Sequence, residues 1–139
     1  MLETTTKVKE LEKVVIRFSG DSGDGMQLVG NMFSNLSAFI GNGISTFPDY
    51  PAEVRAPKGT LSGVSGFQVH LGAKSVYTPG DKADVLVAMN PAALKVNVNN
   101  IKKNAVVIYD TDSFAKSDLD KALFTTADPF AELGLGSVQ

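Results

Sequence analysis

The sequence predicts an α/β fold in three layers (α/β/α), built on a mostly parallel mixed sheet with a central hairpin. Short apolar runs, typical of buried strands, alternate along the chain with segments of helical periodicity. Between them, residues 61–71 alternate in polarity and lead into a glycine-containing turn, which indicates an antiparallel hairpin with residues 76–77. The 139 residues suffice for one such domain and are too few for two.

The first strand is predicted at residues 14–18, where the run VVIRF ends in the glycine-rich segment SGDSGDG. A helix of about four turns is predicted at residues 26–40 because apolar residues recur at spacings of three and four. These residues are Met26, Val29, Phe33, Leu36 and Ile40, and the stripe is widened by Leu28, Met32 and Phe39. We therefore expect this helix to bury one broad apolar face. Asp24 stands where a cap or a first-turn carboxylate would stand.

A second short strand is predicted at residues 44–47, and a long stiff loop follows at residues 48–59. Three prolines within ten residues exclude a regular helix or a central strand from this loop. Beyond the hairpin, the expected elements are a strand at 84–89, a helix at 92–101, a strand at 105–109 and a short helix at 115–123. Residues 1–13 are expected to form a polar leader and residues 127–139 a tail or truncated linker without a final element.

Composition excludes several kinds of chemistry. The chain has no cysteine, which rules out disulfides, cysteine-ligated iron–sulfur clusters and thiol nucleophiles. Its one histidine, His70, rules out a two-histidine metal site and lacks an obvious partner in the sequence. A redox centre would therefore be a bound organic cofactor or would belong to another polypeptide.

Charge and hydropathy narrow the choice of partner and location. A net charge of -2 without a basic run argues against nucleic acid as the main partner. No segment has the roughly 18 consecutive apolar residues that a membrane span needs. The polar residues 1–13 lack the apolar core of a secretory signal, so a cytoplasmic location is the default expectation.

The first candidate site is the loop formed by Gly20, Asp21, Ser22, Gly23, Asp24 and Gly25, between a strand and a helix. Glycines allow close approach of a ligand, and a helix N-terminus offers unpaired N–H groups to a phosphate. The spacing G-x-x-G-x-G differs from the dinucleotide fingerprint G-x-G-x-x-G, and the two aspartates repel phosphate. Both a ligand loop and a tight strand-to-helix turn with the aspartates capping the helix stay open.

The second candidate is the proline-containing loop, where Arg55 and Lys58 could hold a carboxylate or a phosphate on a stiff support. A contact surface for another subunit is an equal alternative. The third candidate is Asn90, at the carboxyl end of a strand, where ligands of parallel sheets bind. A helix cap is the favoured role for Asn90. Asp110 and Asp112 end the next strand, where they would bind a metal or a ribose hydroxyl, or initiate a turn.

Four segments together resemble one family. They are FSGDSGDGMQLVG at residues 18–30, ISTFPDYPAEVRAP at 44–57, GTLSGVSGFQVHLG at 59–72 and DVLVAMNPAAL at 84–94. In this order they resemble the gamma domain of 2-oxoacid:ferredoxin (acceptor) oxidoreductases. The segments SGDSGDG and FPDYPAEVRAP are most similar to the 2-oxoglutarate branch, the KorA-like alpha subunits, in which a gamma domain precedes a thiamine diphosphate-binding region.

The resemblance implies that residues 14–126 form a gamma-type domain, which supports coenzyme A-dependent oxidative decarboxylation of a 2-oxoacid. Thiamine diphosphate, magnesium and iron–sulfur clusters are then expected in the alpha and beta partner chains, with ferredoxin as the electron acceptor of the complex. This chain would bind none of these tightly, while coenzyme A would contact the Gly20–Gly25 loop, Arg55, Lys58 and Asn90. The alternatives are a free-standing nucleotide-binding module and a scaffold domain without a ligand.

Overall fold

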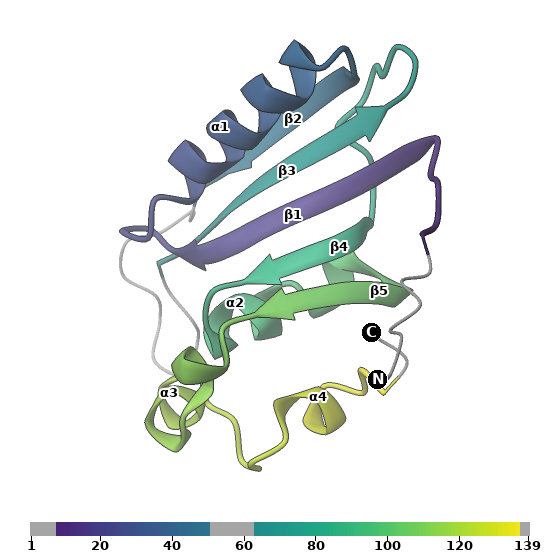
Figure 1. The fold of residues 1–139 in the computed structure, drawn as a ribbon. Helices are drawn as coiled ribbons and strands as arrows, with labels where there is room; N and C mark the ends of the chain where they lie inside the picture. Colours follow the sequence, from purple (N-terminus) through teal and green to yellow (C-terminus); the bar gives the residue numbers. More distant parts are fainter. Residues whose placement is uncertain (1–7, 51–62, 137–139) are drawn as a thin grey trace, which may run out of the picture.

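A computed structural model describes residues 8–50 and 63–136 and shows one five-stranded sheet with helices on both faces (Figure 1). The strands are β1 (Lys13–Asp21), β2 (Gly43–Asp49), β3 (Val64–Gly72), β4 (Ala83–Ala88) and β5 (Ile101–Tyr109). The α-helices are α1 (Met26–Phe39), α2 (Pro91–Val96), α3 (Lys116–Lys121) and α4 (Pro129–Glu132), and 3-10 turns stand at Val98–Asn100 and Thr111–Phe114. The α/β fold expected from the sequence is confirmed.

The sheet has the order β2-β3-β1-β4-β5. The strand pairs on one side of β1 are antiparallel and those on the other side are parallel. The pairs β1–β4 and β4–β5 are parallel, whereas β3 is antiparallel to both β1 and β2. The predicted hairpin partner at residues 76–77 is wrong, because these residues are not in a strand. Instead, the Gln68 side chain holds the following turn by donating to the carbonyls of Pro79 and Gly80, both at 3.0 Å.

One face of the sheet is covered by α2. Alternation along β1 directs Val15 to this face, and Leu86 and Leu94 are fully buried in the same cluster. The helix ends earlier than predicted because Asn97 caps it, donating from its side chain to the Ala93 carbonyl at 2.7 Å. The strand that follows accordingly begins at Ile101 instead of residue 105.

The other face is covered by α1, which packs on β3, β1 and β2. Phe18, Met26, Phe67 and Val69 form the buried cluster there. The helix residues that the sheet buries are mostly small, namely Gly30, Ser34 and Ser37, together with Met26. The expectation of one broad apolar face buried in the core is therefore wrong in part. Phe33 packs partly against this cluster, but most of the other large side chains, including Leu36 and Ile40, are exposed.

The reason for this inversion is the closeness of α1 to the sheet. A Cβ atom added at Gly30 would lie 2.2 Å from two ring carbons of Phe67. Only small residues fit at this distance, so the large apolar residues of α1 point elsewhere.

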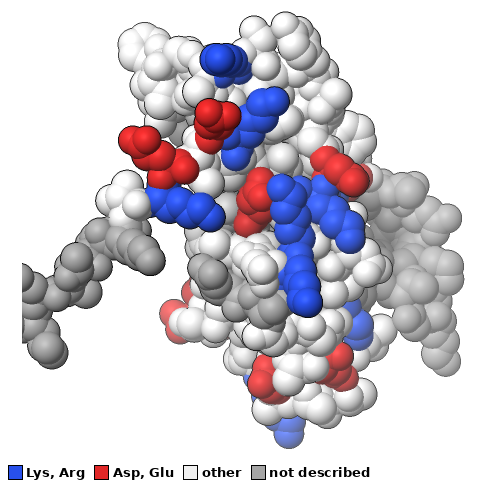
Figure 2. All heavy atoms as spheres, turned by 90° about the vertical axis from the view of Figure 1, so that its right-hand side faces the viewer, with Lys and Arg blue, Asp and Glu red and all other residues white. Residues whose placement is uncertain are grey.

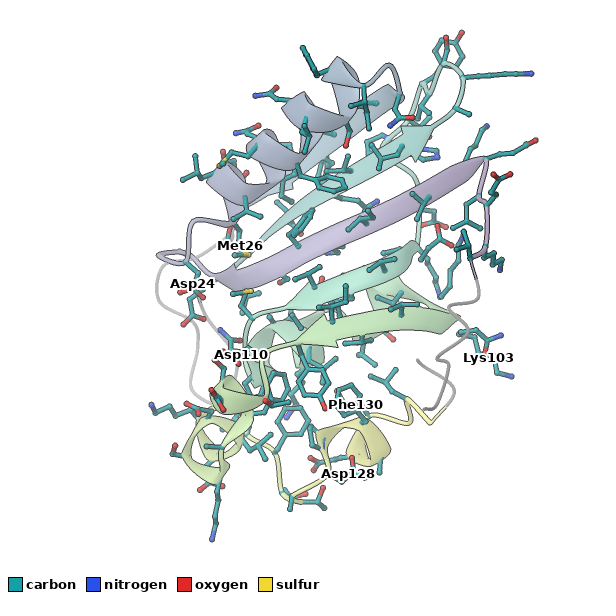
Figure 3. All side chains as sticks on the ribbon, viewed as in Figure 1. Asp24, Met26, Lys103, Asp110, Asp128 and Phe130 are labelled. Atoms are coloured by element: carbon teal, nitrogen blue, oxygen red, sulfur yellow. The ribbon has the colours of Figure 1, made fainter. Side chains whose placement is uncertain are left out.

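The C-terminal part packs onto the α2 side of the domain. The predicted short helix is present as α3, and α4 adds one turn that the sequence analysis did not expect. Asp128 caps α4 by accepting from the Ala131 N–H at 3.1 Å. The Phe130 ring lies 5.1 Å from the Tyr109 ring, so this turn rests on the end of β5 (Figure 3). Within residues 8–50 and 63–136, no helix is long and apolar enough to cross a membrane.

Candidate functional site

The topology gathers most of the predicted site residues at one edge of the sheet. The parallel strands β1, β4 and β5 end at this edge, and the antiparallel strand β3 begins there. The Gly20–Gly25 loop, Asn90 and Asp110 follow these strand ends. Figure 3 shows Asp24 and Asp110 on this side and Lys103 on the opposite side. This is the edge at which ligands of open α/β sheets generally bind.

The Gly20–Gly25 loop is a tight turn held by its own aspartates. The Asp24 carboxylate accepts from the Asp21 N–H at 2.9 Å, and the Asp24 N–H donates to the Asp21 carbonyl at 2.9 Å. The N–H and the hydroxyl of Ser22 both donate to the Gly63 carbonyl at 2.7 Å, which fixes the loop to the start of β3. The predicted tight turn is thus present, and the Asp24 carboxylate is used within it.

The same contacts leave the N-terminus of α1 without a side-chain cap. Its N-cap residue is Gly25, which has a φ of 74°, and within residues 8–50 and 63–136 no side-chain capping hydrogen bond is present. The prediction that Asp24 caps this helix is therefore wrong, since its carboxylate is turned back to Asp21. Among the described residues, nothing caps the first-turn N–H groups of α1, and such groups can bind an anion.

Gly20 and Gly23 differ in what requires them to be glycine. A Cβ at Gly20 would lie 3.0 Å from the Asp24 carboxylate and 3.1 Å from the Met89 Cβ, so internal packing explains this position. A Cβ at Gly23 would meet nothing within 4 Å among the described residues, and its φ is not left-handed. The space above Gly23 is therefore open, as close approach of a ligand to the backbone requires.

Asn90 caps α2 and also braces the loop. Its side-chain oxygen accepts from the Ala93 N–H at 2.8 Å, which confirms the favoured capping role. Its side-chain nitrogen donates to the Asp21 carboxylate at 3.0 Å. Asn90 and the Gly20–Gly25 loop, 69 residues apart in sequence, thus form one connected unit.

The neighbouring acids serve local turns. The Asp110 carboxylate accepts from the Asp112 N–H at 3.1 Å and from the Ser113 hydroxyl at 2.8 Å, as expected for a turn initiator. In the described part of the chain, no three His, Asp or Glu side chains gather as a metal site. Arg55 and Lys58 lie outside the described residues, so their part in the site stays a prediction.

A buried polar network beneath this edge was missed by the sequence analysis. The Arg17 side chain, within the first strand, is 8% exposed and forms an ion pair with Asp49 at the end of β2. Its guanidinium also donates to the side-chain oxygens of Asn97 at 2.5 Å and of Gln68 at 3.2 Å. The available signal was a charged residue inside a buried strand, because a buried charge requires a partner.

This network continues towards the candidate site. Asn97 donates to the Ser19 hydroxyl at 2.8 Å, and Ser19 in turn donates to the Ser65 carbonyl at 3.1 Å. Every buried side-chain polar atom of the described residues has a hydrogen-bond partner. The network therefore fixes the ends of β1, β2 and β3 relative to α2, immediately behind the Gly20–Gly25 loop.

The opposite edge of the sheet carries a hollow of about 440 Å³. It is lined by lysines and acids together, among them Lys13, Lys82, Lys102 and Asp84 (Figure 2). Burial raises the pKa of the Asp84 carboxyl, but hydrogen bonds from Lys102 and the Val15 N–H, with the charges of Lys102 and His70, lower this pKa overall. His70 lies at this edge, with its Nδ1 2.6 Å from the Thr78 carbonyl, away from the Gly20–Gly25 loop.

Comparison with known proteins assigns the chain to a family. Residues 15–135 match the family model of pyruvate ferredoxin/flavodoxin oxidoreductase. The chain belongs to this family. It is 52% identical over 118 residues to the 2-oxoglutarate oxidoreductase subunit KorA of Mycobacterium tuberculosis, a match that covers 85% of this chain and 18% of KorA. It is 28% identical over 113 residues to the ketoisovalerate oxidoreductase subunit VorA of Methanothermobacter marburgensis, covering 81% of this chain and 22% of VorA.

Solved structures agree with this placement. The 2-oxoglutarate:ferredoxin oxidoreductase of Magnetococcus marinus, which was solved with 2-oxoglutarate, coenzyme A and succinyl-CoA bound, matches with a TM-score of 0.63 and 29% identity. This match covers 73% of this chain and 17% of that chain. A keto/oxoacid ferredoxin oxidoreductase gamma subunit from Geobacter sulfurreducens shares the fold, with a TM-score of 0.56, 24% identity and coverage of 72% and 52%. Our chain thus spans about a fifth of the curated relatives that it matches.

Proposed function

We propose that this chain is the gamma-type domain of a 2-oxoacid:ferredoxin oxidoreductase, with 2-oxoglutarate as the 2-oxoacid. It supports coenzyme A-dependent oxidative decarboxylation together with alpha and beta chains, and ferredoxin accepts the electrons. The observation that carries this proposal is the 52% identity to the 2-oxoglutarate oxidoreductase subunit KorA across 85% of the chain. The structural match to the Magnetococcus marinus enzyme supports the same assignment.

In this proposal the chain supplies a binding surface and no reactive centre. It has no cysteine with which to ligate an iron–sulfur cluster. Its one histidine lies at the edge opposite the candidate site. Thiamine diphosphate, magnesium and the clusters are therefore assigned to the alpha and beta chains, and we expect the isolated chain to be inactive.

Coenzyme A, the acceptor of the acyl group, is assigned to the edge that carries the Gly20–Gly25 loop. The open backbone at Gly23 and the uncapped N-terminus of α1 offer N–H groups to its phosphates. Asp21 and Asp24 bring negative charge close to this position, so cations must offset them. Arg55 and Lys58 are the chain's proposed cations for this purpose. Asn90 acts through Asp21, by holding the loop in place.

Calorimetric titration tests the proposal. Coenzyme A, NADH and flavin are titrated into the isolated chain and then into its assembly with the alpha and beta chains. We expect coenzyme A to bind only in the assembly, and Arg55→Ala to weaken that binding about tenfold or more without unfolding the domain. Lys74→Ala, an exposed lysine at the opposite edge, is the matched control and should bind normally.

The alternatives give different results in the same titrations. NADH binding to the isolated chain would instead indicate a free-standing nucleotide-binding module. Binding of none of the three ligands in either state would indicate a scaffold domain. Normal coenzyme A use by the Arg55→Ala assembly would remove Arg55 from the site.

A further inference from the structure

The distribution of large and small residues on α1 is the reverse of that on an ordinary helix packed on a sheet. Its sheet side carries Gly30, Ser34 and Ser37, whereas five large apolar side chains on its outer flank form what we name the α1 stripe. The stripe consists of Leu28, Met32, Leu36, Phe39 and Ile40, which are 64%, 63%, 62%, 88% and 69% exposed. Residues 26–40 contain no Asp, Glu, Lys or Arg. A solvent-facing helix normally carries charges on its outer side.

The α1 stripe continues onto an uncovered part of the sheet. At about 3.6 residues per turn, the stripe adjoins Phe33, whose ring lies 5.5 Å from the ring of Phe18 on β1. The stripe therefore runs from the outer side of α1 to the flank that faces β1 and, beyond it, β4 and β5. Figure 1 shows that α1 lies over β2 and β3, while none of the described helices covers β4 and β5 on this side.

The uncovered part of the sheet is also apolar. Leu86 and Val107 point towards α2, so the alternation directs the neighbouring residues of β4 and β5 to the α1 side. On that side, Val106 is 37% exposed and Ile108 is 54% exposed. The α1 stripe and the exposed side chains of Val106 and Ile108 thus border one apolar surface, which changes level from the helix to the sheet. We call this surface the apolar step.

We propose that this step is the docking surface for the alpha chain of the oxidoreductase, an inference that rests on the proposed function. The matched segment is only 18% of KorA and 17% of the Magnetococcus marinus chain, so in both proteins most of the polypeptide lies outside it. In those proteins this remainder belongs to the same polypeptide as the matched segment, and an alpha region of that size, fused or separate, can cover both the helix flank and the strand face. Depletion of charge with enrichment of Leu, Met and Phe is the composition of an interface core.

The length of the stripe suits a packed helix or sheet of the partner. The fourteen residues of α1 extend about 21 Å along the helix axis. The exposed strand face enlarges the surface across that axis. Packing on the step would complete the second apolar layer that the chain itself leaves open, in the same way that α2 completes the first. The candidate coenzyme A edge begins at the N-terminal end of the same helix, so docking here would bring the partner next to that edge.

The test is assembly of the full chain with the alpha and beta chains, measured by light scattering and by affinity titration. The double variant M32E/L36K places an i, i+4 ion pair on the stripe, which maintains helix stability while it makes the surface polar. The matched control N31E/N35K places the same pair on exposed polar positions of the same helix. We expect M32E/L36K to weaken assembly by about a hundredfold and N31E/N35K to leave it within about threefold.

Each outcome decides between the two proposals. If the original chain assembles and the assembly binds coenzyme A, but M32E/L36K assembles equally well, the docking surface is wrong and the proposed function stands. If the original chain neither assembles nor contributes to coenzyme A binding, the proposed function itself is wrong. If the stripe instead supports only self-association, seen as a doubled mass that M32E/L36K reverts, a second copy and not the alpha chain is the occupant. Assembly that also tolerates Ile108→Lys would remove the strand face from the surface.

Discussion

Two leucines show that the helices on the two faces of the sheet differ in how far they bury their large apolar side chains. Leu94 of α2 is fully buried against β4 and β5, whereas Leu36 of α1 is 62% exposed. Beneath α2, even the charged Arg17 is buried, and each of its three guanidinium nitrogens has a hydrogen-bond partner. On the outer flank of α1, large apolar side chains have no neighbours among the described residues that bury them.

The difference separates folding from assembly. The α2 face gains its stability within the chain, because its apolar and polar groups all have partners there. On the other face, small residues of α1 allow the helix to lie close to the sheet. The large apolar residues of α1 therefore point away from the sheet, where another surface can pack on them. Conservation of hydrophobicity on the two helices would therefore have two different physical causes, one in the core and one in an interface.

The largest expected effect comes from the same substitution on the two helices. Leu94→Ala should lower the free energy of unfolding by about 3–4 kcal/mol, because it leaves a cavity in a fully packed cluster. Leu36→Ala should change it by less than about 0.5 kcal/mol, since that side chain is already in water. Urea unfolding of both variants measures the difference. Equal losses would contradict the distinction between the two faces.

The polar network gives the next prediction. Arg17→Met should cost about 3 kcal/mol, because it retains volume but removes the donors that serve Asn97, Gln68 and Asp49. Asp49→Asn, at the exposed end of the network, keeps an acceptor but removes the counter-charge of Arg17, and it should cost less than Arg17→Met, about 1–2 kcal/mol. Thermal and urea unfolding test both. A neutral Arg17→Met would mean that the network does not stabilise the fold.

A glycine pair tests the close approach of α1. Gly30→Ala should cost about 2 kcal/mol, because its Cβ would overlap the Phe67 ring and push the helix from the sheet. Gly23→Ala should leave stability within about 0.5 kcal/mol, since the described residues leave room for its Cβ. The same Gly23 variant should weaken coenzyme A binding by the assembly. Normal binding would show that the ligand does not approach this loop.

The smallest effect concerns pH and the opposite edge. The folded-state pKa of Asp84 lies below its ordinary value of 3.8, so its carboxylate stabilises the fold above that pH. This contribution, less than about 1 kcal/mol, is lost as the pH falls through the folded-state pKa. Asp84→Asn should therefore reduce the acid sensitivity of unfolding as the pH falls below 3.8. Unaltered acid sensitivity would assign that loss of stability to other carboxyls.

Local patterns were sufficient for much of the fold. The apolar runs identified β1, β4 and β5, and the glycine-rich turn after β1 placed the start of α1 at Met26. Asn90 before Pro91 identified a helix start, because a capping side chain and a proline at the first position act within a few residues. Strand pairing was harder to predict from the sequence, since the partners of β3 are set by contacts between residues far apart in the chain.

The sequence by itself determined the α/β class, the edge at which strand ends meet and the family, because these depend on local periodicity and on ordered motifs. Only the tertiary structure decided which side of α1 is buried, since that depends on the distance between Gly30 and Phe67. It also decided that Asp24 turns back to Asp21 and that Arg17 is paired beneath the site. Periodicity shows that a helix has an apolar flank, but the packing distance determines whether that flank faces its own sheet or another molecule.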